Sequence, residues 1–258
     1  MSFIFFAVYL PAQTVRARVD CFSTGSYHER FTDVFSTTAN PAALVYARPF
    51  TAGVYAGRRF LNTVRHFILA AAIPAGKDGL GIQADHITAP SYAQSAVGLG
   101  YAKTLGQAAI GARFHYHRIM VAAYGSIAGM AVEAGSNWHI TDDIRVAMCI
   151  YLPAGGKVKP AYYYRGGMAW AIADQLLLML EASKEENRRV NIHAGIYYRP
   201  TPRITLQSGI TTGNAQPYVA AWLQWNQLRV LVSVIYSMQL GGVPGIAVIY
   251  APPAIITP

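Results

Sequence analysis

The chain is poor in charged residues. Asp, Glu, Lys and Arg make up 13% of its 258 residues, against about 25% in typical soluble domains. It also lacks a run of about 18 apolar residues free of charged and turn residues, so no transmembrane helix is expected. Hydrophobic residues nevertheless amount to 53%, and the mean hydropathy is +0.25. The apolar residues must therefore be dispersed along the chain, which is typical of transmembrane β-barrels.

Cysteines are scarce, and the usual catalytic sets are missing. Cys21 and Cys149 do not have the spacing of metal ligands, which argues against a structural zinc site. A single disulfide in an oxidising compartment stays open. No Ser-His-Asp set, glycine-rich phosphate loop or pair of catalytic carboxylates stands at a recognisable spacing. We expect no enzyme and no cofactor; a barrel with lipase or protease activity is the less favoured alternative.

Basic residues exceed acidic ones, with a formal net charge of +9, but they do not cluster. A nucleic-acid-binding surface normally shows a basic patch or stripe. Here the arginines are spread over the expected strands, one or two on each: Arg58, Arg113, Arg145, Arg199, Arg203 and Arg229. We therefore expect no nucleic-acid partner. The basic side chains should face a polar lumen or the anionic headgroups of lipids.

From about Thr51 to Tyr250 apolar and polar residues alternate in short runs separated by turn residues. Because successive side chains in a strand point to opposite faces, each run has one apolar and one polar face. In residues 190–199 the apolar face is Val190, Ile192, Ala194, Ile196 and Tyr198. Such a pattern over about 200 residues predicts an all-β, transmembrane, antiparallel up-and-down barrel. A soluble β-sandwich with a large core is the alternative.

The alternation and the turn residues predict fourteen strands. Their ranges are 51–60, 64–73, 79–86, 92–105, 108–117, 124–138, 144–152, 161–173, 175–183, 190–199, 203–212, 215–225, 228–238 and 243–250. Twelve strands also stay open, since strand boundaries are uncertain by a few residues. An even count puts both ends of the chain on the periplasmic side. The longer connections, such as 74–78 and 87–91, do not exceed about eight residues, so there is little room for an external domain.

The N-terminal residues differ from the rest. Residues 1–12 resemble the end of a secretory signal peptide cut after Ala12, but they lack a basic start and the apolar core is short. Residues 13–48 alternate poorly, and Asn40-Pro41 favours a turn, with one helical turn from Pro41 through Leu44. We expect an irregular segment over 13–48, a barrel over 49–250 and a tail over 251–258.

Polar residues on the strands are the candidate site residues. Those expected to line the lumen are Arg58, Asp85, Arg113, His115, His117, Arg145, Glu181, His193 and Arg229. Because buried charges need partners, acids and bases, Glu133 among them, should pair across the interior and close it. His115 and His117 lie on one face of a strand, but the sequence places no carboxylate to complete a metal site. A wet lumen-lining pair is therefore favoured over a metal.

Several short motifs resemble those of the FadL-like outer-membrane barrels, and within them the PorV/PorQ proteins of type IX secretion. The first is Asn40-Pro41-Ala42-Ala43-Leu44; the others lie at 92–106 with 109–116, at 194–198 with 204–210, and at 241–250. The resemblance implies fourteen strands with an N-terminal segment packed in the lumen, where Asn40, Pro41, Ala42 and Leu44 would form a hatch. The chain departs from the fatty-acid transporters of this superfamily in lacking long outer loops. It also continues beyond the aromatic residue of its last strand.

The resemblance implies a non-enzymatic barrel in the outer membrane of a Gram-negative bacterium. Its function would be that of an accessory, docking or scaffold subunit of an envelope complex, with outer-membrane lipid and other envelope or secretion-complex proteins as partners. The alternative is a FadL-like transporter of hydrophobic small molecules such as fatty acids, which would bind a hydrophobic ligand. The sequence does not identify the substrate or cargo.

Overall fold

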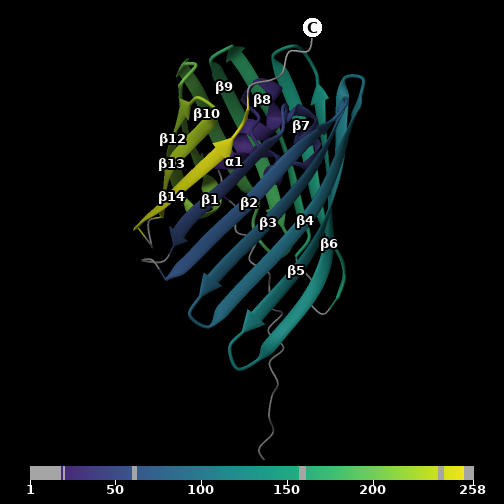
Figure 1. The fold of residues 1–258 in the computed structure, drawn as a ribbon, viewed down its shortest axis with the longest axis vertical. Coiled ribbons are helices and arrows are strands. Elements are labelled where there is room, and N and C mark those ends of the chain that lie inside the picture. Colours follow the sequence, from purple (N-terminus) through teal and green to yellow (C-terminus); the bar gives the residue numbers. More distant parts are fainter. Residues whose placement is uncertain (1–18, 20, 60–62, 157–160, 238–240, 253–258) are drawn as a thin grey trace, which may run out of the picture.

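The computed structural model describes residues 19, 21–59, 63–156, 161–237 and 241–252. Fourteen antiparallel strands within these ranges form a closed barrel, in which each strand pairs with its neighbours in sequence and β1 pairs with β14 (Figure 1). The closed barrel confirms the predicted fold class and excludes the β-sandwich. The number of strands is fourteen, not twelve.

The strands differ in length around the barrel. The first seven strands are β1 (Thr51–Arg59), β2 (Val64–Ala75), β3 (Asp78–Ala89), β4 (Tyr92–Leu105), β5 (Ala108–Val121), β6 (Gly125–His139) and β7 (Ile144–Gly156), of which β2 to β7 are the longest in the barrel. The others are β8 (Tyr163–Ala173), β9 (Leu176–Glu185), β10 (Asn191–Thr201), β11 (Ile204–Thr211), β12 (Gln216–Trp225), β13 (Leu228–Ser237) and β14 (Gly241–Tyr250). A short 3-10 turn, η4 (Thr212–Asn214), joins β11 to β12.

Several strands are longer than the sequence predicted. β2 continues through Pro74 to Ala75, and β3 runs from Asp78 to Ala89. The expected connections 74–78 and 87–91 therefore shrink to two residues each, Gly76-Lys77 and Pro90-Ser91. Turn-forming residues such as Pro74 suggested a loop, but the register of β2 with β3 continues through it.

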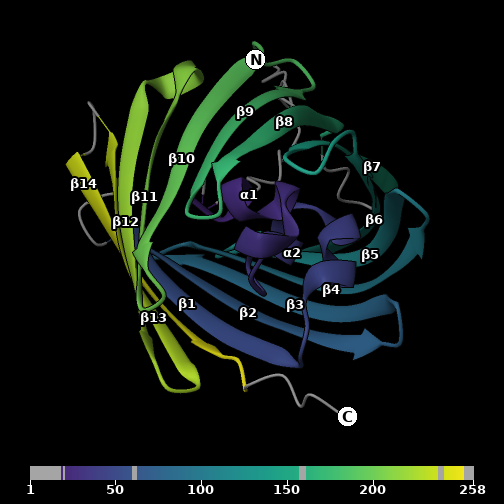
Figure 2. The same cartoon turned by 90° about the horizontal axis from the view of Figure 1, so that it is seen from above.

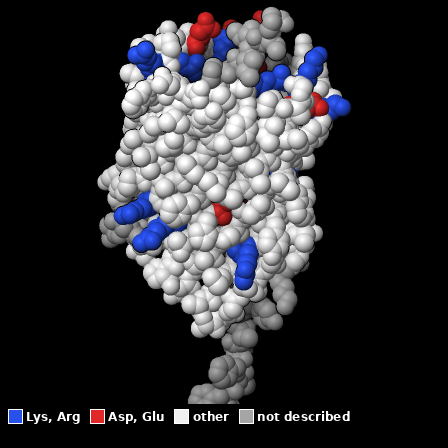
Figure 3. All heavy atoms as spheres, viewed as in Figure 1, with Lys and Arg blue, Asp and Glu red and all other residues white. Residues whose placement is uncertain are grey.

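The outward and inward faces of the strands follow the period-two alternation. On β5 Phe114 and Tyr116 are about half exposed on the outside, at 46% and 45%, whereas Arg113, His115 and His117 are buried inside. Large apolar side chains face outward on all fourteen strands. Figure 3 shows the result as a broad band of outer surface without charged side chains, with basic and acidic groups toward the two ends.

The N-terminal residues 21–46 fill one end of the lumen, and we call them the plug (Figure 2). They form five short helical turns: α1 (Cys21–Thr24), η1 (Gly25–Tyr27), η2 (Glu29–Phe31), α2 (Ser36–Ala39) and η3 (Pro41–Tyr46). No helix in the described part of the chain is long and apolar enough to cross a membrane. The sequence predicted only the helical turn after Pro41, because the other turns are too short to show a periodic pattern.

The plug has an aromatic core that continues into the barrel wall. Phe22 stacks on Phe35 with ring centroids 4.5 Å apart, and Tyr55 of β1 meets Phe22 edge-on at 5.3 Å. Phe31 packs in the same edge-on way against Tyr197 of β10. Apolar contacts therefore hold the plug on two sides of the barrel, near the end where the chain enters β1 and leaves β14.

Candidate functional site: the plugged lumen

A row of inward-facing glycines seats the η3 turn directly on the wall. A side chain added at Gly111 of β5 would place its Cβ 2.5 Å from Pro41 C and 2.6 Å from Ala42 N. At Gly135 of β6 the Cβ would meet Asn40 Oδ1 and lie 2.9 Å from Pro41 Cδ. Gly79, Gly81 and Gly100 face Leu44 in the same way. We call these five residues the glycine seat.

The capping of η3 explains why Asn40 occupies this place. Its side-chain oxygen accepts a hydrogen bond from Ala42 N at 3.0 Å, which is an N-cap interaction, and Pro41 follows at the first helical position. The Asn40 amide also donates to Ser136 O of β6 at 3.2 Å. One residue therefore starts the turn and ties it to the wall.

A buried polar network joins α2 to β5, β6 and β7. Glu133 lies 3.3 Å from Arg113 Nη1 and 3.1 Å from His115 Nε2, and it accepts the thiol hydrogen of Cys149 at 3.3 Å. Arg113 also donates to Thr37 O of the plug at 2.6 Å. Since a buried charge is strongly destabilising without a partner, the acid and the bases have to be retained together.

A second network holds the η1 turn. The Tyr27 hydroxyl donates to Glu181 Oε2 at 2.9 Å, and Arg165 of β8 lies 3.6 Å from the same carboxylate oxygen. Asn137 of β6 donates its amide to Ser26 O and Tyr27 O. Gly167 leaves the space that the Tyr27 hydroxyl occupies.

A third network lies on the opposite wall. His193 of β10 bridges the plug and the barrel, with Ser23 Oγ 3.1 Å from its Nδ1 and Tyr218 Oη 3.1 Å from its Nε2. Thr24 Oγ1 contacts the same Tyr218 hydroxyl at 3.0 Å. Polar side chains from several strands therefore hold the plug. We predict that the plug does not move freely within the barrel.

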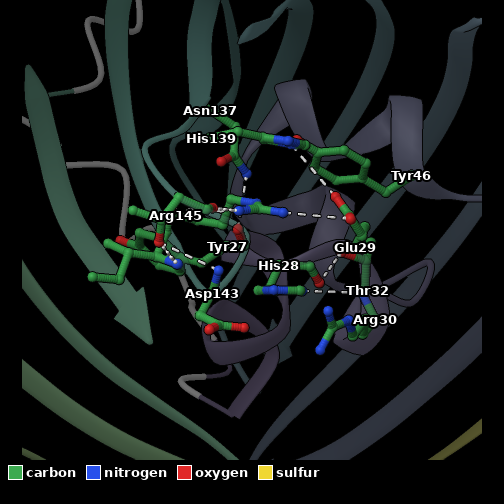
Figure 4. Close-up of polar contacts among 12 residues, drawn as sticks. Tyr27, His28, Glu29, Arg30, Thr32, Tyr46, Asn137, His139, Asp143 and Arg145 are labelled. Carbon is green, nitrogen blue, oxygen red and sulfur yellow. Dashed lines mark hydrogen bonds and ion pairs between the residues drawn. The ribbon is translucent and has the colours of Figure 1, made fainter. Parts of the chain in front are cut away.

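At the rim the plug carries ionic contacts, which Figure 4 shows. Glu29 lies 3.4 Å from His139 and 3.5 Å from Arg145, and the Tyr46 hydroxyl is 3.0 Å from His139 Nε2.

Burial, and to a smaller extent the positive charge of Arg145, lowers the pKa of His28. Burial, and next the charge of Glu29, raises the pKa of Tyr46. Both side chains are therefore held neutral.

Asp33 is the plug carboxyl with the strongest desolvation. Burial raises its pKa above 3.8, against the opposing effects of Arg229 and of hydrogen bonds from Ser36. Asp33 Oδ1 accepts from Ser36 N at 2.8 Å and from Ser36 Oγ at 3.0 Å. Arg229 of β13 donates to the Tyr197 hydroxyl and lies over the Trp222 ring at 4.5 Å.

A cavity of about 110 Å³ lies between the plug and the wall. Its lining is partly apolar and partly polar, and includes Ile68, Ala96, His117, Tyr151, Tyr163 and Arg165. Two polar atoms in this wall, Arg165 Nη2 and Gln83 Oε1, have no hydrogen-bond partner among the described residues. The cavity can therefore take a small molecule with an apolar body and a group that accepts a hydrogen bond.

The structure brings most of the predicted lumen residues to the interior. Inside are Asp85, Arg113, His115, His117, Arg145, Glu181, His193 and Arg229. Asp85 pairs with His66 at 3.2 Å. Arg58 is the correction: it is exposed and shares the outward face of β1 with Val54. Small residues occur on both faces of β1, and Arg58 is followed directly by Arg59, so the alternation did not distinguish the two faces.

Cys21 and Cys149 remain as buried thiols without a disulfide. No group of three or more His, Cys, Asp or Glu side chains in the described ranges is arranged to hold a metal ion. The possible signal-peptide end at residues 1–12 lies outside the described residues.

Sequence reasoning missed the glycine seat and three wall residues, His66, Arg165 and Tyr218. A signal for the seat was present, because Gly79, Gly81, Gly100, Gly111 and Gly135 all fall on the lumen-facing positions of the alternation. Inward glycines on successive strands mark a place where another backbone approaches closely. For Arg165 and Tyr218 the sequence holds no comparable signal, since their partners lie on other strands or in the plug.

Comparison with known proteins adds structural neighbours only. No family model and no curated protein matches the sequence. Among solved structures, the CymD monoaromatic hydrocarbon channel matches with a TM-score of 0.65 and 9% identity over 90% of this chain and 97% of that one. A Pseudomonas aeruginosa FadL homologue gives 0.62 and 10%, covering 90% and 98% of the two chains. The Pseudomonas putida toluene transporter TodX gives 0.59 and 10%, covering 88% and 94%.

At such low identity these matches concern the fold. They agree with the observed closed barrel of fourteen strands. These matches do not support the narrower PorV/PorQ assignment. The chain has the fold of the FadL-like outer-membrane β-barrels.

Proposed function

We propose that this protein is a non-enzymatic barrel of a Gram-negative outer membrane that binds small hydrophobic molecules in its lumen and passes them across. The observation that carries the proposal is the cavity of about 110 Å³ between the plug and the wall. The matched structures support it, since two of the three carry the names of a hydrocarbon channel and a toluene transporter.

The outer surface supports the membrane location. Side chains such as Leu69, Leu99 and Val219 are 55–64% exposed on the outward face. Soluble monomers rarely expose contiguous apolar patches larger than a few hundred Å². A hydrocarbon environment accounts for this surface, because lipid covers apolar side chains without loss of free energy.

The size of the cavity limits what it can hold. An engineered protein cavity of about 150 Å³ binds benzene, so a space of about 110 Å³ suits a single ring or part of an acyl chain. The neighbouring Arg165 Nη2 would donate a hydrogen bond to the polar end of such a ligand. The plug lies in the lumen, so passage along the barrel axis would require the plug to shift.

The experiment is photolabelling of the purified barrel with a diazirine derivative of decanoic acid, followed by peptide mapping. We expect label on the cavity-lining parts of β4, β5 and β8. Ala96→Phe fills the cavity from β4 and should lower this label several-fold. Ala112→Phe adds the same ring to the outward face of β5 and serves as the control. Label restricted to the outward face, and unchanged by Ala96→Phe, would refute the proposal.

The PorV/PorQ-like accessory function is the second candidate. The short connections favour it, since the described turns at the barrel end away from the chain termini, such as Pro90-Ser91, are too short to gather a substrate. The many polar contacts that hold the plug in place also fit a scaffold better than a channel. Mass spectrometry of secreted and surface proteins from a deletion strain tests it: loss of a set of cargo proteins supports this function, and an intact secretome excludes it.

A further inference from the structure

Two arginines face each other on the outer surface. Arg58 of β1 and Arg65 of β2 are direct cross-strand partners, and both are exposed on the outward face. Like charges at directly opposed positions destabilise a sheet. The arrangement is therefore unfavourable unless an anion lies between or above the two guanidinium groups.

The polar row continues along the neighbouring strands. His86 of β3 pairs in register with Ser95 of β4, which pairs with Arg118 of β5. His86 Nδ1 lies 2.9 Å from Ser95 Oγ, and Arg118 is exposed on the outward face. We call Arg58, Arg65, His86, Ser95 and Arg118 the arginine row. From β2 to β5 it spans about 14 Å, at about 4.8 Å per strand.

The described residues supply no acid to this row. Residues 51–121 contain two carboxylates, Asp78 and Asp85. Asp78 begins β3 at the opposite end of the barrel, and Asp85 faces inward and pairs with His66. Among the described residues, no ion pair involves Arg58, Arg65 or Arg118.

The row stands where the apolar outer band ends. The next outward residue along β2 is Phe67, and along β5 it is Tyr116, both of them exposed. Beyond them an apolar groove of about 450 Å³ runs over the outer face of β14, β1, β2 and β3. Outward alanines form its floor, and larger apolar residues form its sides: Ala52, Ala71 and Ala84, with Val54, Leu69, Ile82 and Val248.

We propose that the arginine row and this groove together bind a phosphate-bearing lipid, with the phosphate on Arg58 and Arg65 and an acyl chain in the groove. Guanidinium groups bind phosphate through paired hydrogen bonds, which a lysine cannot reproduce. The headgroups of a bilayer lie at the boundary of the apolar band, where the row stands. The groove on the same strands favours a lipid over a soluble phosphate. The inference rests on the membrane location proposed above.

The test is native mass spectrometry of the full chain in a mild detergent, titrated with phosphatidylglycerol, with diacylglycerol or with inorganic phosphate. We expect phosphatidylglycerol to bind well above diacylglycerol. The double variant Arg58→Gln/Arg65→Gln should weaken its binding by at least about tenfold, since it removes both cations that bind the phosphate. Lys103→Gln/Arg203→Gln removes the same charge at the other end of the barrel and should leave binding unchanged.

Three outcomes would overturn the inference. They are equal loss in both double variants, equal binding of diacylglycerol, and binding of inorganic phosphate that matches the lipid. If the glutamine variant does not fold, Arg58→Lys/Arg65→Lys keeps the charge but not the paired hydrogen bonds, and it should still weaken lipid binding several-fold. Labelling of the lumen with decanoic acid is a separate measurement. A negative result for lipid binding therefore leaves the test of the proposed function unaffected.

Discussion

Individual residues inside the barrel show how a polar lumen can also be closed. Glu133 contacts Arg113 and His115, and Glu181 contacts Tyr27 and Arg165. These side chains would line a water-filled channel if the plug were absent. Here Arg113 donates to the plug backbone at Thr37 O, and Glu181 accepts a hydrogen bond from the plug side chain Tyr27. Residues that the sequence pattern predicts to make the lumen polar therefore also hold the plug in the folded protein.

Asp33 permits a pH test at this scale. Because burial raises its pKa in the folded state above 3.8, the fold favours the neutral carboxyl, and its contribution to stability is lost as pH rises through the folded pKa. Asp33→Asn keeps an oxygen acceptor for Ser36 but cannot ionise. We expect the variant to be more stable than the wild type at neutral pH and to lose that advantage below about pH 4.

The measurement is urea unfolding in detergent at pH 3.5 and pH 7.5, followed by tryptophan fluorescence. Asp174→Asn is the control, because that carboxylate is 88% exposed. A stability difference between Asp33→Asn and wild type that does not change with pH would show that Asp33 does not titrate in this range.

At the scale of elements, the plug depends on small residues in the wall. The η3 turn touches the backbone of β5 and β6 because Gly111 and Gly135 carry no side chain. A helix turn and a strand cannot approach so closely across any other residue. The seat therefore sets where the hatch segment Asn40–Leu44 lies and how firmly it is held.

Gly135→Ala should disturb this contact, since its Cβ would lie 2.9 Å from Pro41 Cδ and closer still to Asn40 Oδ1. We expect a loss of about 1–3 kcal/mol in stability, as for other overpacked sites. Plug residues near Asn40 should become more accessible to protease. Gly166→Ala on β8 is the matched control, since the nearest atom to its Cβ is 3.7 Å away. Equal effects of the two substitutions would argue against a close-packed seat.

At the scale of the whole molecule, closure removes sheet edges. β1 bonds to both β2 and β14, so each strand has two hydrogen-bonded neighbours. In a membrane this is required, because unpaired backbone groups cannot bond to water. Folding of the barrel should therefore depend on the last strand as much as on the first.

Truncation tests this dependence. A chain ending at Ser237 loses β14 and leaves β1 and β13 each without a partner, so we expect no compact form. A chain ending at Ala251 keeps all fourteen strands and should fold. Gel mobility with and without heating distinguishes the cases: the folded barrel should shift on heating. A heat-dependent shift in the chain lacking β14 would show that closure is not needed.

The outward and inward faces of most strands, their number and the irregular N-terminal segment follow from local order in the chain. Period-two alternation is a property of residues that are neighbours in the chain. The inward and outward faces of β5 and β10 can therefore be assigned without knowledge of the strands beside them. On β1 small residues occupy both faces, and the side on which Arg58 lies follows from pairing with Arg65 on β2. The plug contacts, the cavity and the arginine row join residues from distant strands. They depend on strand register and barrel closure, which short-range patterns do not encode.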